Sequence, residues 1–309
     1  NRAAYKAPHV IIKKGQSDSK FCSSFLDYDC SFGTGLYGIH KDNEEVNLKV
    51  ITGFLNSRLA EYLMLLLTGN WGIEREQFMP TEILNLPDLC FSLPEAAKKE
   101  IVGYVDEIIA IRKQEPEAVF LDIGKEIAVF EQKIENAFRQ ALNLSETDQI
   151  LIDDLLNYQL DAFQSGEKSI AFRPCEPQEM QAYAQYLCKT INEFLVYTPE
   201  ATVWATVFEP EKRLPLNVVA LQMNRLQPSG TIQTLRDTDV GLLLKELEQF
   251  CYQEYAESIY FRKFIRYYKN DVLYILKPNE KRFWSRSMGL NDADEIILEL
   301  LTAENGQQP

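Results

Sequence analysis

Residues 55–87 read LNSRLAEYLMLLLTGNWGIEREQFMPTEILNLP, and this stretch decides the organisation of the N-terminal part of the chain. Its first third continues an apolar pattern of helical spacing that starts near Glu45. The pattern predicts one helix over residues 45–67, ended by Gly69. Residues 79–94 contain three prolines and are predicted to be an extended linker. The apolar positions of the helix are Val46, Val50, Phe54, Leu55, Leu59, Tyr62, Leu63 and Leu66.

On the N-terminal side of this helix, the sequence predicts strands. Residues 8–14, PHVIIKK, have the composition of a short buried strand that begins after a proline. Residues 19–41 are rich in Ser, Gly, Asp and aromatic residues, which is typical of loops and strands. Glycines in this region permit sharp turns between strands. They are Gly33, Gly35 and Gly38.

The middle of the chain, residues 94–164, is predicted to be helical. Pro94 opens one helix, at a position where proline is tolerated. A second helix is expected over about residues 118–142. Ser145 and Asp148 have the spacing of an N-terminal capping box for a third. Residues 165–174 are predicted to be a linker.

The C-terminal part predicts a mixed α+β unit. A helix at 177–195 precedes two β-rich runs, 201–208 and 216–223, which are expected to form a hairpin. A helix at 239–257, a second hairpin formed by 263–268 and 271–277, and a final helix at about 291–302 follow. The predicted fold class is therefore α+β and multidomain. Residues 1–92 form a mixed β/helix recognition domain, 93–165 a helical spacer, and 166–309 an accessory α+β domain with antiparallel hairpins.

Composition restricts the class of protein. The chain has 309 residues, 46% of them hydrophobic, which suits a globular protein with a buried core. No apolar run approaches the roughly 20 residues of a membrane span, and no signal peptide is recognisable. Six cysteines without a C-x-x-C pair favour a reducing compartment, so we expect a cytoplasmic protein without a metal site. The net charge of −14 argues against a DNA-coating protein, but residues 1–80 hold 9 basic and 9 acidic residues.

Three segments, in this order and spacing, resemble a known family. They are PHVIIK at 8–13, LNSRLAEY at 55–62 and PTEILNLP at 80–87, with TGLYGIH at 34–40 between the first two. Together they resemble the target-recognition region that follows the catalytic domain in bacterial adenine-N6 DNA methyltransferases of fused restriction-modification enzymes. Residues 127–156 are similar to the helical segment that comes after the recognition strands in those enzymes.

The resemblance implies a DNA-binding function in restriction-modification or phage defence. The implied partners are double-stranded DNA and an upstream methyltransferase domain, and S-adenosylmethionine is the implied cofactor of the parent enzyme. The start at Asn1 fits a piece of a longer protein. No catalytic residue is assigned in this chain, and the implied parent protein is a site-specific adenine-N6 DNA methyltransferase. The alternative function is a specificity or scaffold subunit that docks a separate methyltransferase or nuclease.

Candidate DNA contacts in the N-terminal part lie at a strand end and in a loop. Lys13, Lys14 and Lys20 follow the first strand and are candidates for phosphate contacts, which position a protein without reading sequence. The alternative is that they are ordinary solvated lysines. Asn70, Trp71 and Arg75 lie in the loop after the predicted helix, where functional residues are common. Trp71 has the alternative role of covering the core.

The second candidate surface is the basic and aromatic stretch 260–286, which holds 8 basic and 2 acidic residues. Cations interleaved with aromatic rings suit nucleic-acid backbones and unstacked bases. The alternative is a hairpin whose aromatic rings pack inside and whose cations pair with the acidic remainder of the domain. The predicted DNA contacts here are Arg262, Arg266, Lys281, Arg282, Trp284 and Arg286.

Catalytic motifs are absent from this sequence. An adenine-N6 methyltransferase needs an Asn/Asp-Pro-Pro-Tyr/Phe motif that holds the flipped adenine, and no such tetrapeptide occurs. FGTG at 32–35 has no clear helix after it, so it is a weak candidate for a cofactor loop. Asp122, Glu131 and Lys133 have the order of a metal-dependent nuclease but lie in a predicted helix. A cryptic nuclease in the C-terminal domain is a third hypothesis.

Overall fold

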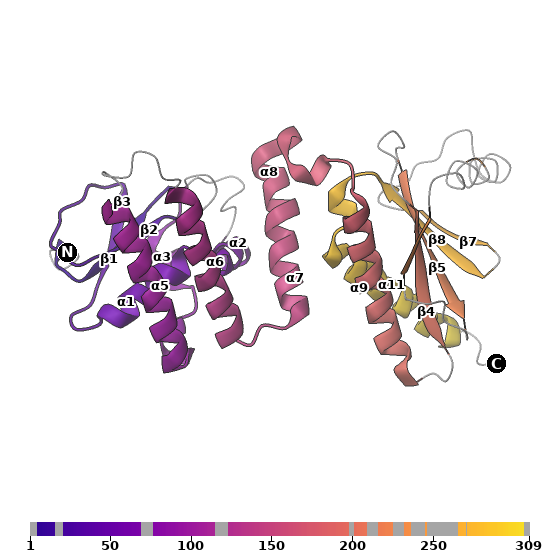
Figure 1. Cartoon of the computed structure of the whole chain (residues 1–309), viewed down its shortest axis with the longest axis horizontal. Coiled ribbons are helices and arrows are strands. Elements are labelled where there is room, and N and C mark those ends of the chain that lie inside the picture. Colours follow the sequence, from indigo (N-terminus) through magenta and orange to yellow (C-terminus); the bar gives the residue numbers. More distant parts are fainter. Residues whose placement is uncertain are drawn as a thin grey trace. The chain divides into compact units, whose positions relative to one another are not determined.

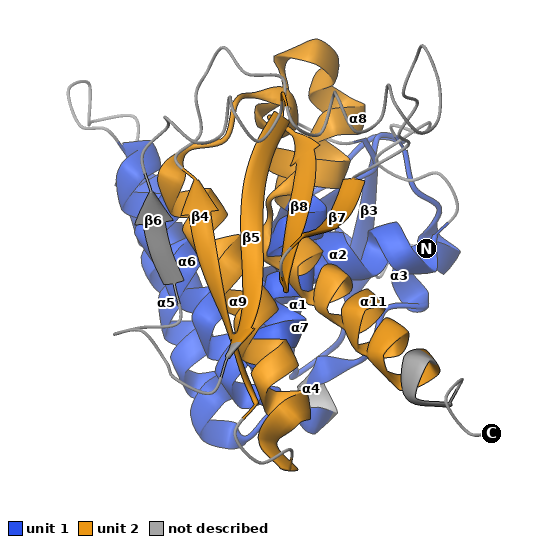
Figure 2. Ribbon diagram, turned by 90° about the vertical axis from the view of Figure 1, so that its right-hand side faces the viewer, with its two compact units in different colours: residues 1–156 blue, residues 157–309 orange. Residues whose placement is uncertain are grey.

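The computed structural model of the chain consists of two compact units, residues 1–156 and 157–309 (Figure 2). The described residues are 5–15, 21–68, 77–114, 123–197, 201–208, 216–224, 232–235, 245, 265–269 and 271–305. Each unit combines helices with one sheet, which confirms the α+β class. Residues 93–156 of the predicted helical spacer belong to unit 1 and residues 157–165 to unit 2.

Unit 1 contains a three-stranded antiparallel sheet in the order β2-β1-β3 (Figure 1). Its central strand β1 (His9–Lys13) lies between β2 (Ser23–Leu26) and β3 (Leu36–His40). Val10 and Ile12 are completely buried, as expected for alternate residues that face a core. The strand predicted at residues 8–14 is thus confirmed.

Two helices, not one, follow this sheet. α1 (Glu45–Leu55) and α2 (Arg58–Leu67) meet at an angle of 73°. The break is built by capping residues: the Asn56 amide bonds to main-chain atoms of Ser23 at 2.9 Å, and Ser57 Oγ accepts from Ala60 N at 3.2 Å. A serine hydroxyl at this position satisfies one of the unpaired N–H groups at a helix start. The prediction of one continuous helix is therefore wrong.

The segment predicted as an extended linker is also helical in two places. α3 (Pro80–Leu84) and α4 (Leu89–Ser92) occupy most of residues 79–94. Pro80 stands at the first position of α3, where its missing N–H costs no hydrogen bond. The Glu82 carboxylate accepts from Met79 N at 2.7 Å and stabilises the start of this turn.

Three further helices complete unit 1: α5 (Glu95–Gln114), α6 (Ile123–Ala141) and α7 (Glu146–Asp154). Figure 1 shows α5 and α6 side by side, and α1 packs on both of them. Gly53 makes this packing close, because a Cβ there would lie 3.1 Å from the Ile101 side chain. The capping box of Ser145 and Asp148 at the start of α7 is confirmed.

Short helical turns connect the two units: η3 (Leu155–Leu160), α8 (Asp161–Ser165), η4 (Gly166–Lys168) and η5 (Ile170–Phe172). η3 and α8 lie in the stretch predicted to be helical, whereas η4 and η5 lie where the sequence predicted a linker at 165–174. The Asp161 carboxylate holds them together by accepting from Ser165 Oγ, Ser169 Oγ and Ile170 N. α9 (Pro177–Phe194) follows as predicted and continues into η6 (Leu195–Tyr197).

The sheet of unit 2 has five strands in the order β6-β4-β5-β8-β7. Both predicted hairpins are confirmed, because β4 pairs with β5 and β7 pairs with β8, each antiparallel. A parallel pairing of β6 with β4 was not predicted. The strands are β4 (Thr202–Phe208), β5 (Leu216–Asn224), β6 (Ile232–Leu235), β7 (Ile265–Lys269) and β8 (Val272–Pro278).

One face of this sheet is covered by α9 and by α11 (Arg286–Asn305), which follows the turn η7 (Lys281–Phe283) (Figure 2). α11 begins at Arg286, before the predicted start near residue 291. The two helices approach closely at Gly289, where a Cβ would lie 2.6 Å from the Tyr183 carbonyl oxygen. Apart from residue 245, the helix predicted at 239–257 lies outside the described residues.

Candidate nucleic-acid interface

The C-terminal end of β1 carries the first pair of predicted DNA contacts. Lys13 is exposed and pairs with Leu36 of β3, and Lys14 follows directly. Lys14 N donates to Gly35 O at 3.0 Å, which fixes the main chain. The Lys14 ammonium lies 4.5 Å from the centre of the Tyr37 ring, within the range of a cation–π contact. The structure thus brings Lys13 and Lys14 to one edge of unit 1.

Tyr37 is a residue of this edge that the sequence did not single out. Its hydroxyl donates to Phe78 O at 3.3 Å, and the two ring centres lie 5.8 Å apart. Phe78 is buried and also contacts Phe21, with ring centres 5.0 Å apart. Tyr37 is therefore a fixed support under the Lys14 side chain. The only sequence signal was its place in TGLYGIH at 34–40.

Two described segments, ending at Gly15 and beginning at Gln77, meet at this edge. Gly15 forms an antiparallel bridge with Gln77, and Phe78 N donates to Lys14 O at 3.3 Å. Gly15 is the last described residue before segment 16–20, and Gln77 is the first after segment 69–76. The predicted contacts Lys20, Asn70, Trp71 and Arg75 belong to these two segments and lie outside the described residues. The bridge nevertheless places Gly15 beside Gln77, the described residues that border the two segments.

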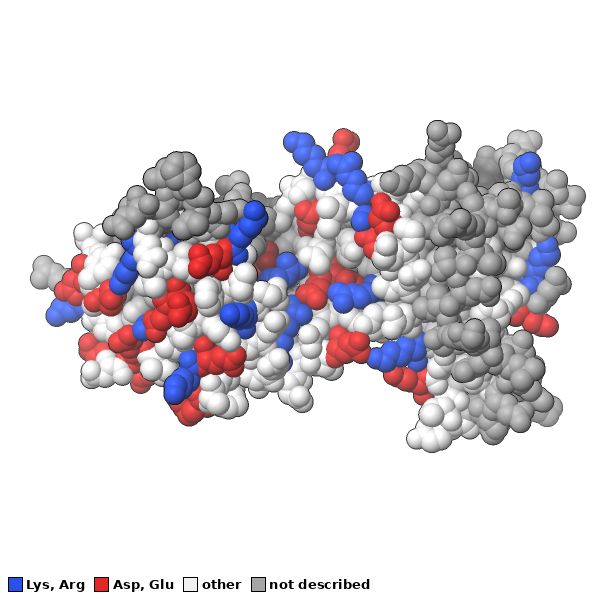
Figure 3. Space-filling view, viewed as in Figure 1, with Lys and Arg blue, Asp and Glu red and all other residues white. Residues whose placement is uncertain are grey.

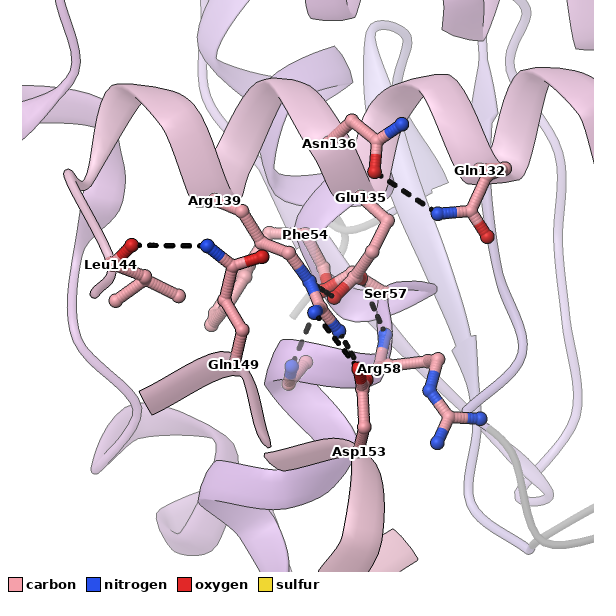
Figure 4. A network of polar contacts seen from close by, with 11 residues as sticks. Phe54, Ser57, Arg58, Gln132, Glu135, Asn136, Arg139, Leu144, Gln149 and Asp153 are labelled. Carbon is pink, nitrogen blue, oxygen red and sulfur yellow. Dashed lines mark hydrogen bonds and ion pairs between the residues drawn. The ribbon is translucent and has the colours of Figure 1, made fainter. Parts of the chain in front are cut away.

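A buried polar network fixes the helix that precedes segment 69–76 (Figure 4). Glu135 of α6 is 4% exposed, and its carboxylate accepts from Arg58 N, at the start of α2, at 3.0 Å. Arg139 Nε donates to the same carboxylate at 2.8 Å, and the Arg139 guanidinium also contacts Asp153 of α7 at 2.7 Å. A carboxylate at a helix N-terminus satisfies unpaired N–H groups and interacts favourably with the helix dipole.

The electrostatics of this network favour the charged guanidinium. Burial alone would lower the pKa of Arg139, but its hydrogen bonds to Asp153 and Glu135 outweigh burial and raise the pKa. Arg139 therefore ties α6 to α7 while Glu135 ties α6 to α2. These contacts fix the start of α2, the helix that leads to Thr68, the last described residue before segment 69–76.

In unit 2, two cations of the basic and aromatic stretch pair with carboxylates on the helices of the same unit. The Arg266 guanidinium lies 2.8 Å from Glu295 and 2.6 Å from Glu299, both on α11. Lys281 Nζ lies 2.5 Å from Glu179 of α9. These contacts match the alternative in which the cations neutralise the acidic remainder of the domain.

Arg282 is paired as well. Its Nε lies 2.7 Å from Glu280, and its guanidinium lies 4.5 Å from the Phe172 ring centre and 4.7 Å from that of Phe283. Arg286 opens α11. Arg262 lies outside the described residues.

Trp284 belongs to the core of unit 2. Its side chain has no exposed surface, its Nε1 donates to Pro278 O at 2.9 Å, and its ring meets that of Tyr183 edge-on at 5.0 Å. A ring in this position cannot stack on a base. The packing contradicts the predicted DNA contact of Trp284, because the apolar area of the indole is more stable inside the core than on the surface.

A fully buried ion pair, which the sequence did not reveal, lies beside Trp284. Lys277 of β8 and Asp292 of α11 are 0% and 1% exposed and contact each other directly, and the Tyr183 hydroxyl donates to Asp292. Burial lowers the pKa of Lys277, and the charge and hydrogen bond of Asp292 offset part of this effect. Burial, followed by the charge of Asp292, raises the pKa of Tyr183. The group is closed to solvent and serves packing.

Other kinds of site find little support in the described parts of the chain. They contain no group of three or more His, Cys, Asp or Glu side chains placed to hold a metal ion. Of the nuclease-like set, Glu131 and Lys133 lie on α6, and Asp122 is outside the described residues. On the face drawn in Figure 3, described basic side chains are interspersed with acidic ones.

Within the described residues no single helix is long and apolar enough to cross a membrane, although the bent pair α1 and α2 meets that test when taken together. No protein-family model matches the chain, and no curated protein matches its sequence.

Proposed function

We propose that this chain is the DNA-binding, target-recognition part of an S-adenosylmethionine-dependent adenine-N6 DNA methyltransferase of a restriction-modification or phage-defence system. In this proposal unit 1 contacts double-stranded DNA through the end of β1, and a methyltransferase domain upstream in the parent chain transfers the methyl group. The proposed setting is the cytoplasm, where thiols stay reduced. Two supports exist: the ordered family resemblance of residues 8–87 and the geometry at the end of β1.

The observation that carries the proposal is the convergence at Gly15 and Gln77. Lys14 rests on the ring of Tyr37 at the same edge from which segments 16–20 and 69–76 depart. In this proposal the Tyr37 ring supports the Lys14 ammonium, which contacts a phosphate and so helps to position the protein on DNA. In the same proposal segment 69–76 supplies the amide, indole and guanidinium groups that contact base edges in a groove.

Within this proposal the two sets of residues have different roles. Lys13, Lys14 and Lys20 contact phosphates and set the position of unit 1 on the duplex. Asn70, Trp71 and Arg75 contact bases and carry specificity. The adenine must leave the base stack to reach the methyl donor, and the upstream domain performs that step. S-adenosylmethionine is bound by that domain, so no residue of this chain is assigned to it.

The overall charge is compatible with this division of labour. Residues 1–80 carry equal numbers of basic and acidic residues, and the excess of acid lies in residues 81–309. The cations Arg266, Lys281 and Arg282 are engaged with carboxylates of unit 2. We therefore assign the DNA contact to unit 1 rather than to a clamp at 260–286.

Fluorescence anisotropy of a labelled duplex, measured across a series of salt concentrations, tests the proposal. The double variant Lys13→Ala, Lys14→Ala should lower the slope of log affinity against log salt by up to about 0.9 for each phosphate contact that it removes. The matched control is Lys99→Ala, Lys113→Ala, which removes two exposed lysines from α5 of the same unit. Equal slopes for both double variants would overturn the assignment of Lys13 and Lys14.

The parent enzyme is tested separately by the gene. The upstream reading frame should encode a Gly-rich cofactor loop and an Asn/Asp-Pro-Pro-Tyr/Phe motif, and the full-length product should methylate adenine. A full-length product without either motif would contradict the methyltransferase assignment. DNA binding by this chain would then favour a specificity subunit that acts with a separate enzyme.

A further inference from the structure

A cysteine and a histidine meet at the other end of β1. Cys30 Sγ lies 3.5 Å from His9 Nε2. His9 is the first residue of β1 and is completely buried, whereas Cys30 lies in the segment between β2 and β3 and is half-buried. The thiol therefore stands between solvent and an imidazole nitrogen.

The main chain holds both partners in place. His9 is paired with Leu26 of β2 and with His40 of β3, so its backbone is fixed on both sides. Cys30 N donates to Tyr5 O at 3.1 Å, and Ala7 N donates to the Asp29 carboxylate at 2.8 Å. These two bonds fasten the segment of Cys30 to the residues that lead into β1. The S···N contact is a feature of the folded sheet.

Aromatic rings and a few ionisable groups surround the pair. The Phe32 ring meets the His9 ring edge-on at 6.4 Å and contacts the Tyr5 ring at 4.9 Å. Asp29 is the carboxylate next to Cys30 in the chain. On β3, His40 Nδ1 contacts Pro8 O at 3.0 Å and its Nε2 contacts Asp42 at 3.2 Å. Phe32 therefore gives the pair an aromatic neighbour, and Asp29 adds a carboxylate at the residue before Cys30.

The other described thiols differ from Cys30. Cys175 and Cys188 are buried in unit 2, and burial raises their pKa, that of Cys188 to about 12. Such thiols rarely form the reactive thiolate. Cys22 is exposed and provides a reference for solvent access. Cys30 combines partial exposure with a histidine ring nitrogen beside its sulfur.

We propose that Cys30 and His9 form a nucleophilic thiol–imidazole pair, and that Cys30 is a site of covalent modification by small, uncharged, soft electrophiles. His9 Nε2 takes the thiol proton as the sulfur attacks. With iodoacetamide, the S–C bond forms, the C–I bond breaks, iodide leaves, and the imidazolium then releases its proton to solvent. A thiolate is the reactive form of cysteine, and an adjacent base supplies it.

The surroundings determine which electrophile reacts best. The Phe32 and Tyr5 rings favour a small apolar or neutral reagent. The Asp29 carboxylate disfavours an anionic one. Neutral iodoacetamide should therefore react faster than anionic iodoacetate at Cys30. The ratio of the two rates should be larger at Cys30 than at the exposed Cys22.

This site is separate from the proposed DNA contact. His9 and Lys13 are the two ends of a five-residue strand, which spans about 13 Å. The reactivity of Cys30 does not depend on whether unit 1 binds DNA. It can therefore be measured even in a chain that fails to bind a duplex.

Alkylation of the native full chain by iodoacetamide, quantified for each cysteine peptide by mass spectrometry, tests the pair. As pH falls from about 8 to about 6, an ordinary thiol loses about tenfold in rate per unit. We expect the ratio of the Cys30 rate to the Cys22 rate to rise over this range. A constant or falling ratio in the wild-type chain would overturn the proposal.

Two variants isolate the role of His9. His9→Asn and His9→Gln should each lower the alkylation rate of Cys30 by at least about tenfold at neutral pH, because general-base assistance contributes that much or more. The Cys22 rate should stay unchanged, and Cys175 and Cys188 should stay unmodified if the fold is intact. A folded variant in which Cys30 reacts as fast as in the wild type would refute the role of His9. If both variants unfold, the wild-type pH series still decides.

Discussion

Cations of the two units have different partners. In unit 2, four of them each contact a carboxylate: Arg266, Lys277, Lys281 and Arg282. In unit 1, Lys14 lies over the ring of Tyr37 at a strand end. The amino-acid pattern is similar in both places, with cations beside aromatic residues. The difference lies in the partners: α9 and α11 bring Glu179, Glu295 and Glu299 to the cations of unit 2. A basic and aromatic stretch is therefore a weak indicator of DNA binding where acidic helices cover the same sheet.

The largest predicted effect concerns the buried pair of unit 2. Asp292→Ala leaves the Lys277 charge in the core without its partner, and we expect a loss of about 3–5 kcal/mol in the free energy of unfolding. Urea unfolding followed by circular dichroism measures this loss. The double variant Lys277→Met, Asp292→Leu should recover much of the stability, since it removes both charges. If the double variant were no more stable than Asp292→Ala, the ion pair with Lys277 would not explain the contribution of Asp292 to stability.

A smaller effect is expected for the network of unit 1. Glu135→Ala removes the acceptor of Arg58 N but leaves Arg139 its contact with Asp153. The expected loss in unfolding free energy is about 1–3 kcal/mol, the usual cost of an unsatisfied buried group. Glu131→Ala, at an exposed position of the same helix, is the matched control and should change stability by less than about 0.5 kcal/mol. Equal losses for both variants would argue against a special role of Glu135.

The surface pairs of unit 2 should matter less again. Arg266→Gln breaks contacts to Glu295 and Glu299, whose side chains are 53% and 54% exposed. Ion pairs with solvated partners contribute about 1 kcal/mol or less. Chemical denaturation gives the stability, and anisotropy gives the affinity for a duplex. A large loss of DNA affinity in this variant would restore the basic clamp that the pairing disfavours.

The smallest effect is a pH dependence at the start of α7. Hydrogen bonds from the Ser145 hydroxyl and then from Ser145 N lower the pKa of Asp148. A carboxyl group with a lowered folded pKa stabilises the fold above its unfolded value near 3.8, and the contribution is lost as pH falls through the folded pKa. In an NMR titration, the midpoint of Asp148 should be lower in the wild-type chain than in the Ser145→Ala variant. Identical midpoints would contradict this cause.

Local patterns in the sequence predicted several elements correctly. Alternating burial in β1, the helical spacing of α9 and the capping box at Ser145 are local signals, and each element formed where it was expected. The break between α1 and α2 escaped prediction because Asn56 and Arg58 fit the polar side of one continuous helix. The partner of Asn56 is Ser23, which lies far away in the sequence.

The candidate site was less accessible to sequence reasoning. Lys13 and Lys14 were identified at the strand end, but their neighbours Tyr37 and Gln77 come from other segments. The pairing of Lys281 with Glu179 joins residues on different elements of unit 2. No periodicity or spacing encodes such contacts, because they arise only when the sheet and helices assemble.

Lysine footprinting tests the central claim most directly: that the end of β1, and not the basic stretch of unit 2, faces DNA. The full chain is acetylated briefly with and without a saturating duplex, and each lysine is quantified by mass spectrometry. We predict that DNA protects Lys13 and Lys14 and leaves Lys281 and Lys269 unchanged. Protection of Lys281 and Lys269 with none at Lys13 and Lys14 would contradict the account.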